Sequence, residues 1–201
     1  MRMIEKNEFT NWERAYRANF VNSLTGFKSV GLIGTVNEDG VTNLAIFSSM
    51  VHLGANPALI GFINRPLTAT SHTFKNIKNQ GSYTINHIHD GMVDQAHKTG
   101  EKFPDGVSEF DEVGLTPLYI EGVQVPFVKE SRIKYLLELK EIIPIQWNDT
   151  FLVIGGLEKV IIEDQIIALD GFLNINESKS VCSNGLDAYY ETQPIKRIPR
   201  I

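Results

Sequence analysis

The strongest constraint on the fold is a pair of apolar runs joined by a four-residue turn signal. The runs, Gly31–Val36 and Val41–Phe47, favour extended backbone, and Asn37–Gly40 between them reads Asn-Glu-Asp-Gly. Amide and acidic residues that end in glycine between two such runs are typical of a β-hairpin. A third run, Ala58–Ile63, follows an Asn-Pro pair. This part of the chain is therefore expected to form an antiparallel sheet.

Further short β-type runs, separated by turn signals, continue through most of the chain. They are Ser82–Ile88, Leu118–Val128, Ile133–Ile143, Phe151–Ile162, Ile166–Leu169 and Phe172–Ile175. They do not alternate with regular helices, so a parallel doubly wound sheet is disfavoured. A chain of 201 residues with 42% hydrophobic composition can bury one sizeable core, as one large β domain or as two small domains. The expected fold class is mainly β, an antiparallel barrel or sandwich with few helices.

A helical lead-in is expected over residues 1–27. Its aromatic and apolar residues recur at helical spacing, and they are Trp12, Tyr16, Phe20 and Leu24. Such a face is expected to pack on the body of the protein or on a partner chain.

Other segments outside the β-type runs are interpreted as peripheral. Asp90 is expected to cap a short helix over Met92–Lys98. The polar segment Glu101–Gly114 is long for a loop, so we expect a functional loop or lid, and its acidic part, Glu109–Glu112, is expected to cover a ligand or to form a solvated turn. Residues 176–201 are interpreted as a C-terminal tail.

Composition and motifs exclude several classes of protein. The net charge of −5 disfavours a general nucleic-acid binder, and no apolar run is long enough to cross a membrane. The start of the chain has no signal-peptide pattern, and the single cysteine, Cys182, excludes an internal disulfide. A cytoplasmic protein is expected. Neither the G-x-G-x-x-G nor the G-x-x-x-x-G-K-[ST] pattern occurs, so a nucleotide site would be neither Rossmann nor P-loop.

A seat for a phosphate is predicted after the third β-type run. Arg65 is followed by a dense set of hydroxyl residues, which are Thr68, Thr70, Ser71 and Thr73. These lead into a segment of helical spacing that stops at Gly81. A helix start with free N–H donors, hydroxyl groups and a nearby arginine favours an anion.

The end of the second hairpin run is a second candidate site. Residues 42–49 read Thr-Asn-Leu-Ala-Ile-Phe-Ser-Ser, and small or polar residues there would allow a flat ligand to approach the backbone. From these residues alone, an ordinary strand end is equally compatible with the pattern.

Several segments, taken in order, resemble the flavin reductase-like, FMN-binding split-barrel family, which includes flavoredoxins. Gly40 with Asn43–Ser48 is similar to the family pattern G-x-x-N-x-A-P-F-S. The other similar segments are Asn56–Ile60, Thr73–Ile77 with Gly81 and Tyr83–Asn86, Glu109–Pro117, and Pro126–Ser131. The matches run from about Lys28 into the second half of the chain.

The resemblance implies one domain over residues 1–201 that forms a Greek-key, antiparallel split β-barrel, a homodimer, and FMN near the subunit interface. The residues expected to line the isoalloxazine are Asn43, Ala45, Phe47, Ser48 and Ser49. Those expected to hold the phosphate are Arg65, Ser71, His72 and Thr73. The implied activity is hydride transfer at flavin N5, with NADH or NADPH as electron donor and a small-molecule substrate, and no side chain is expected to act as nucleophile or general base.

The sequence departs from the family pattern at several positions, one of which bears on the electron donor. Ile46 and Ala58 replace family prolines, and His72 replaces the aspartate before the helix threonine. Many reductases of this family carry Gly-Asp-His in the later strand region, whereas Trp147–Phe151 has no histidine. An FMN-binding electron-transfer protein without its own NAD(P)H site is therefore the alternative. A pyridoxamine-phosphate oxidase-like enzyme and a cofactor-free β-barrel interaction protein are two further hypotheses.

The histidines admit more than one interpretation. His52 follows the candidate ring seat and is predicted to contact substrate, although a histidine bonded to backbone is equally compatible. His87 and His89 lie two residues apart and could face one side of a strand, but they lack an obvious third ligand, so no metal is expected.

Overall fold

A computed structural model describes residues 1–68, 71–104 and 106–198 of the chain. The strands are β1 (Lys28–Ser29), β2 (Gly31–Val36), β3 (Thr42–Phe47), β4 (Met50–Ala55), β5 (Ala58–Asn64), β6 (Ser82–His87), β7 (Pro117–Leu118), β8 (Phe127–Val128), β9 (Ile133–Ile145), β10 (Thr150–Ile162), β11 (Cys182–Asn184) and β12 (Ala188–Tyr190). The helices are α1 (Lys6–Thr10), α2 (Arg14–Ser23), α3 (His72–Gln80), α4 (Val93–Lys98) and α5 (Glu109–Val113), with short 3₁₀ turns η1 (Asp90–Met92), η2 (Asp164–Ile166) and η3 (Ile175–Ser178).

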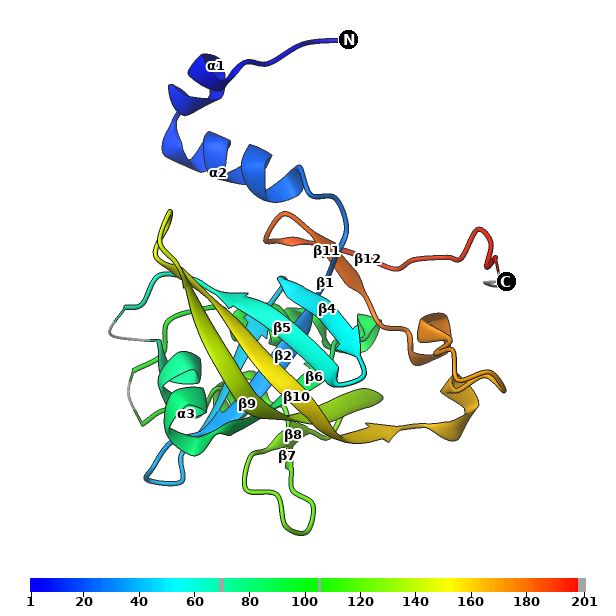
Figure 1. The fold of residues 1–201 in the computed structure, drawn as a ribbon. Coiled ribbons are helices and arrows are strands. Elements are labelled where there is room, and N and C mark those ends of the chain that lie inside the picture. Colours follow the sequence, from blue (N-terminus) through cyan, green and yellow to red (C-terminus); the bar gives the residue numbers. More distant parts are fainter. Residues whose placement is uncertain (69–70, 105, 199–201) are drawn as a thin grey trace.

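One seven-stranded antiparallel sheet forms the body of the protein, in the order β3-β2-β6-β9-β10-β5-β4 (Figure 1). The predicted hairpin is confirmed: β2 pairs with β3 from Gly31 opposite Phe47 to Val36 opposite Thr42. The side chain of Asn37 closes its turn by accepting hydrogen bonds from the N–H groups of Asp39 and Val41. The mainly β, antiparallel fold class is therefore confirmed.

The sheet curls around an apolar interior. Residues that alternate along its strands face inward, among them Ile33, Phe62, Tyr83, Leu137 and Val153. Helix α3 adds Phe74 and Ile77 to this interior, which closes one end of the barrel. Full burial of an apolar side chain of this size contributes about 2 kcal/mol.

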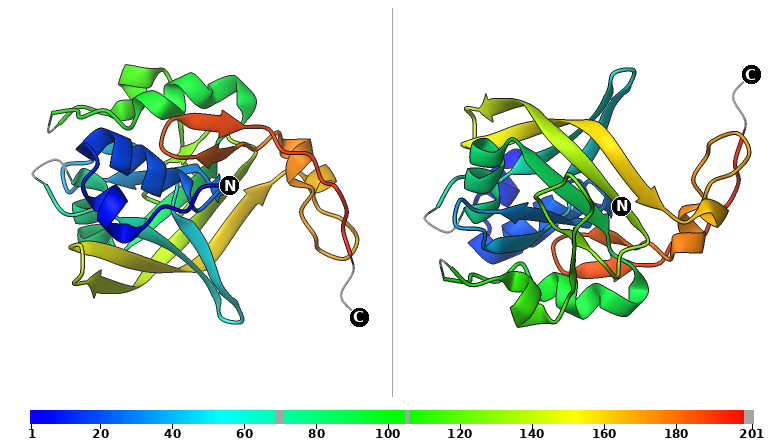
Figure 2. Two further views of the ribbon diagram at one scale, coloured as in Figure 1. Left: turned by 90° about the horizontal axis from the view of Figure 1, so that it is seen from above. Right: turned by 90° about the horizontal axis from the view of Figure 1, so that it is seen from below.

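The outer face of β2 and β3 is covered by α4 and α5, which lie along one side of the barrel (Figure 2). Leu32 and Leu44 point to this side and pack with Met92, Ala96 and Phe110. Both faces of β2 are therefore covered, which explains why β2 is buried at every position, whereas β3 at the edge of the sheet is only partly buried.

The N-terminal helices stand apart from the barrel (Figure 1). Trp12 packs edge-on against Tyr16 and Phe20, with ring centroids 4.9 and 5.0 Å away, and neither α1 nor α2 contains a buried residue. The aromatic face predicted from the sequence therefore clusters on itself and does not pack on the body of this chain.

Several predicted elements are wrong in detail. The runs 166–169 and 172–175 are not strands, because η2 and η3 turn the chain there and leave one isolated bridge between Ile167 and Leu173. Only the two ends of the run 118–128 are strand: Leu118 belongs to β7, residues 127–128 form β8, and residues 119–126 form the loop between them.

The short helix and the tail also differ from expectation. Asp90 does not cap α4, which begins at Val93 after η1, since the Asp90 carboxylate accepts a hydrogen bond from Gly91. The region interpreted as a tail contains β11 and β12, which pair with β1 in a separate three-stranded sheet.

Candidate functional site

The barrel is split between β3 and β4. These strands are the two edges of the seven-stranded sheet, although Ser48 and Ser49 alone separate them in sequence. The hydroxyl of Ser49 donates to the carbonyl of Ile63 (3.1 Å) and accepts from its N–H (3.2 Å). This corner is thereby fixed to β5, and β5 leads directly to Arg65.

The predicted phosphate seat lies at the beginning of α3, which ends at Gly81 as predicted. Ser71 occupies the N-cap position, but its hydroxyl accepts a hydrogen bond from the N–H of Thr68 (2.8 Å), and no described side chain caps the helix. Arg65 is exposed on the same loop, and Thr70 lies outside the described residues. The first turn of α3 therefore offers N–H groups and a positive helix end, and Arg65 precedes it on the connecting loop.

Two of the predicted site residues use their polar groups inside the protein. The buried Asn43 donates from Nδ2 to the hydroxyls of Thr35 (3.2 Å) and Thr73 (3.0 Å). Asn76 of α3 donates to the same Thr35 hydroxyl at 3.1 Å. This network joins β2, β3 and α3, so Asn43 and Thr73 fix the position of the helix start.

Ala45 and Phe47 lie on the same face of β3 as Asn43, because side chains alternate along a strand. Phe47 packs edge-on against Phe62 of β5, with ring centroids 4.9 Å apart. Ala45, Phe47 and Ser48 remain half-buried where β3 forms the edge of the split, so a planar ligand could lie against this edge.

A buried carboxylate behind β3 was not predicted as a site residue. Glu109 is 5% exposed, and its Oε2 accepts a hydrogen bond of 2.9 Å from the N–H of Leu44 on β3. Burial raises the pKa of Glu109, while that hydrogen bond and the nearby His72 act in the opposite direction. The imidazole of His72 therefore lies near Glu109 and is half-buried at the start of α3.

The expectation of an acidic loop over residues 109–112 is thus wrong, because this stretch is the helix α5. Phe110 and Val113, three residues apart, are buried against the outer face of the hairpin. This apolar spacing is typical of a helix and could have indicated one. In the helix, Glu109 faces β3.

A second cation, which interacts electrostatically with Arg65, was also missed. Lys28 Nζ donates to the carbonyls of Gly185 (2.8 Å) and Asn22 (3.2 Å). Burial lowers the pKa of Lys28, and the positive charge of Arg65 lowers it further. The two positive charges are therefore close enough to affect each other.

His52 lies on β4 with an exposed side chain at the rim of a pocket of about 350 Å³. His87 and His89 are held apart by different partners: His87 Nδ1 bonds to Ser180 (3.1 Å), and His89 Nδ1 accepts from the N–H of Gly91 (3.1 Å). The segment Trp147–Phe151, where the family resemblance implies a histidine, covers the end of the turn between β9 and β10 and the first two residues of β10. Trp147 in the turn is 98% exposed.

Because β3 and β4 are edge strands that do not pair with each other, the barrel is an antiparallel split barrel. The candidate site lies at this split, next to the start of α3. Residues 27–172 match the flavin reductase-like domain family, and the chain belongs to that family.

Among similar proteins, a split-barrel-domain protein from Shewanella frigidimarina NCIMB 400, provisionally named a flavin reductase, is 43% identical. It superimposes with a TM-score of 0.96 over 100% of both chains. An uncharacterized protein of Aquifex aeolicus is 29% identical over 76% of each chain. Component B of nitrilotriacetate monooxygenase from Bacillus cereus, 21% identical over 98% of both chains with a TM-score of 0.86, shares the fold.

Helices of a length and apolarity suited to a membrane span are absent from the described part of the chain.

Proposed function

We propose that the protein is an FMN-binding oxidoreductase that passes a hydride through flavin N5 from NADH or NADPH to a small-molecule acceptor. The observation that carries this proposal is the juxtaposition of two seats. The corner Ser48–Ser49 is fixed by Ile63 to β5, and β5 leads through Arg65 to the uncapped start of α3. A ring and a phosphate joined by a flexible chain match this arrangement.

The residues at the α3 end fit a phosphate dianion. Arg65 supplies a guanidinium group, Ser71 supplies a hydroxyl at the N-cap position, and the first turn of α3 supplies N–H groups. Lys28 adds positive charge nearby. The network around Asn43 holds the helix start in place, so these donors are oriented before a ligand arrives.

The residues at the split fit the ring. Ala45 and Phe47 offer an apolar face on β3, and Ser48 and Ser49 offer backbone N–H groups at the corner. The bound flavin supplies reversible hydride transfer, and the protein orients the ring and places donors against its polar edge. His72 lies toward Glu109 and contributes to the electrostatic field behind β3.

We also propose a homodimer, with localisation in the cytoplasm. Large apolar side chains are exposed on β4 and at the base of the N-terminal arm, where Val51 is 43%, Leu53 42% and Phe27 63% exposed. A second copy that covers this surface would exclude water from the edge site. Sedimentation analysis of the full chain measures this: a monomer at micromolar concentration contradicts the dimer.

The alternative function is an FMN-binding electron carrier without a nicotinamide site. It is favoured by one observation: the segment Trp147–Phe151 has no histidine, whereas many reductases of this family carry one in the corresponding segment. The two functions share the flavin seat and differ in the electron donor.

The first experiment measures FMN and riboflavin affinity for the wild type, Arg65→Ala and Lys78→Ala. Lys78 is the matched control, an exposed cation in the last turn of the same helix. Loss of Arg65 is expected to weaken FMN binding roughly 10- to 100-fold, because a charge-assisted hydrogen bond contributes about 1.5–3 kcal/mol. Riboflavin, which lacks the phosphate, should bind both variants like the wild type. Equal FMN affinity of all three proteins contradicts the phosphate seat.

The second experiment titrates the FMN-loaded protein anaerobically with NADH and then NADPH. Prompt bleaching of the flavin absorbance supports the reductase. Bands that persist until dithionite is added contradict the reductase and favour the electron carrier.

A further inference from the structure

A pocket of about 350 Å³ lies at the end of the barrel opposite α3. Its walls include Met50, Ile60 and Tyr135 from the barrel interior, and Val181 and Cys182 from the segment that follows η3. In Figure 1, the orange segment that contains η3 and the green helix α3 lie on opposite sides of the barrel. The volume is sufficient for one ring-sized molecule, because small-ligand pockets start at about 300 Å³.

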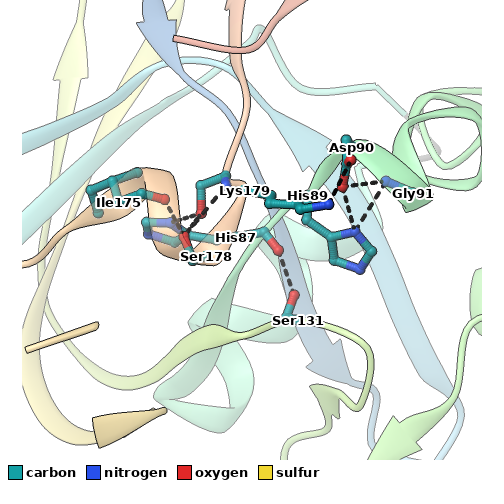
Figure 3. Close-up of polar contacts among 9 residues, drawn as sticks. His87, His89, Asp90, Gly91, Ser131, Ile175, Ser178 and Lys179 are labelled. Atoms are coloured by element: carbon teal, nitrogen blue, oxygen red, sulfur yellow. Dashed lines mark hydrogen bonds and ion pairs between the residues drawn. The ribbon is translucent and has the colours of Figure 1, made fainter. Parts of the chain in front are cut away.

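A chain of hydrogen bonds runs into this pocket from a buried serine. The Ser178 hydroxyl donates to the carbonyl of Ile175 (2.6 Å), which uses its single proton. The Ser178 oxygen lies 2.7 Å from the Ser180 hydroxyl, so Ser180 must be the donor of that bond. Figure 3 shows Ser178 and Ile175 beside the imidazole of His87.

The direction of this chain fixes the proton on His87. Because the Ser180 proton is committed to Ser178, the Ser180 oxygen can bond His87 Nδ1 (3.1 Å) by accepting a proton from it. Neutral His87 therefore carries its proton on Nδ1 and presents a bare lone pair on Nε2. Within the described residues, Nε2 has no hydrogen-bond partner, and His87 lines the pocket.

The imidazole is held in this orientation by its backbone. Ser131 donates to the carbonyl of His87 at 2.5 Å (Figure 3). The N–H of Val181 donates to the carbonyl of the next residue, Ile88, at 2.9 Å. The ring of Tyr135 packs against the imidazole at a centroid distance of 6.1 Å. Burial lowers the pKa of His87 to about 4, so the ring is neutral at physiological pH.

We propose that this pocket binds an uncharged, ring-sized molecule that donates a hydrogen bond from an O–H or N–H group to Nε2 of His87. The described lining contains neither lysine nor arginine, and a lone pair aimed at the ligand repels a carboxylate. Apolar walls select a ring, and the bare acceptor selects a donor, as in phenols. The proposal goes beyond flavin binding and holds whether or not flavin occupies the split.

The first test determines the tautomer of His87 in the full chain by long-range ¹H–¹⁵N NMR. We expect the proton on Nδ1. A proton on Nε2 would overturn the proposal, and this measurement needs no variant.

The second test titrates the protein with phenol, anisole and benzoate, with shifts of the Met50 and Ile60 methyl groups as the signal. Anisole matches phenol in its ring but lacks the donor, and benzoate adds a negative charge. Phenol is expected to bind at least tenfold more tightly than anisole, and benzoate should leave these methyl groups unshifted. Equal affinity for phenol and anisole, or shifts elsewhere in the protein, would contradict the site.

The third test uses Ser178→Ala, with His97→Ala as control, because His97 is an exposed histidine on α4 outside the pocket lining. Without Ser178, the Ser180 hydroxyl is free to donate to His87 Nδ1, and the tautomer preference is relaxed. The preference for phenol over anisole should fall toward one in Ser178→Ala and remain unchanged in His97→Ala. A preference that survives in Ser178→Ala contradicts the directional chain.

Discussion

At one end of the barrel, α3 fills the opening, whereas at the other end the segment after η3 leaves a pocket. Both ends contain buried polar groups. At the α3 end, the amides of Asn43 and Asn76 donate to threonine hydroxyls inside the protein. At the pocket end, the chain from Ser178 ends at His87 Nε2, which faces the cavity.

The difference shows two uses of the same chemistry. A polar network whose members satisfy one another fixes secondary structure, and here it holds the helix start at which a phosphate is proposed to bind. A directed chain that leaves one group unsatisfied creates a preference for a ligand that completes it. The α3 end therefore positions a site from behind, and the pocket end is itself a candidate site.

The largest expected effect comes from breaking the α3 network. Asn43→Ala should lower the free energy of unfolding by about 4 kcal/mol, because it removes two hydrogen bonds and leaves the hydroxyls of Thr35 and Thr73 buried with fewer partners. Urea denaturation measures the change. Asn79→Ala is the control, since Asn79 is an exposed residue of α3 whose bond to Glu38 lies on the surface, and its effect should stay below about 0.5 kcal/mol. Equal effects of the two changes would contradict a stabilising role for the buried network at the α3 end.

The pocket end should respond to pH through His87. Burial lowers the pKa of His87 from 6.5 to about 4, so the unfolded state binds the proton more tightly than the folded state. Stability from this group is fully present above pH 6.5 and is lost as the pH falls toward 4, with a total on the order of 3 kcal/mol. The urea midpoints of the wild type and His87→Gln at several pH values measure it. Parallel pH profiles for the two proteins would contradict this assignment.

Glu109, behind β3, should respond to pH with the opposite sign. Its pKa is raised above 4.5, so stability is present below pH 4.5 and is lost as the pH rises through the folded-state pKa. Glu109→Gln keeps an oxygen for the N–H of Leu44 and should lose this pH dependence. Glu109→Ala should cost about 2 kcal/mol, because it leaves that N–H buried without its acceptor. Thermal unfolding of the wild type and both variants from pH 4 to 8 measures these effects. An equal loss of stability in Glu109→Gln and Glu109→Ala would contradict a stabilising role for the hydrogen bond to Leu44.

Local signals predicted the elements that form from neighbouring residues. The hairpin turn at Asn37–Gly40 and the helix stop at Gly81 are set within a few residues, and Gly40 and Gly81 adopt φ of 82° and 71°, which glycine tolerates. In contrast, β4 and β11 have little β-type pattern, and their extended backbone depends on pairing with β5 and β1. Such pairing partners are invisible in one sequence.

The candidate site divides in the same way. Arg65 lies directly after β5 and Ser71 directly before α3, so sequence order alone predicted where both residues lie relative to these elements. Asn43 bonds Thr73, 30 residues away, and Glu109 bonds Leu44 across 65 residues. The residue types show that these side chains need hydrogen-bond partners. The identity of the partners depends on how α3 and α5 pack against β3, which one sequence does not reveal.

The smallest effect is expected from a polar group inside the barrel that belongs neither to the α3 network nor to the chain that ends at His87. The hydroxyl of Tyr83 is buried without a hydrogen-bond partner among the described residues, beside Gly155, where a β-carbon would lie 2.4 Å from it. Tyr83→Phe removes the desolvated hydroxyl and keeps the ring that contacts Phe62, so it should leave stability unchanged or raise it by less than about 1 kcal/mol. Urea denaturation of Tyr83→Phe beside Asn43→Ala measures this directly. If Tyr83→Phe instead costs more than about 1 kcal/mol, the hydroxyl has a partner such as a buried water, and the interior would be polar between the two ends as well.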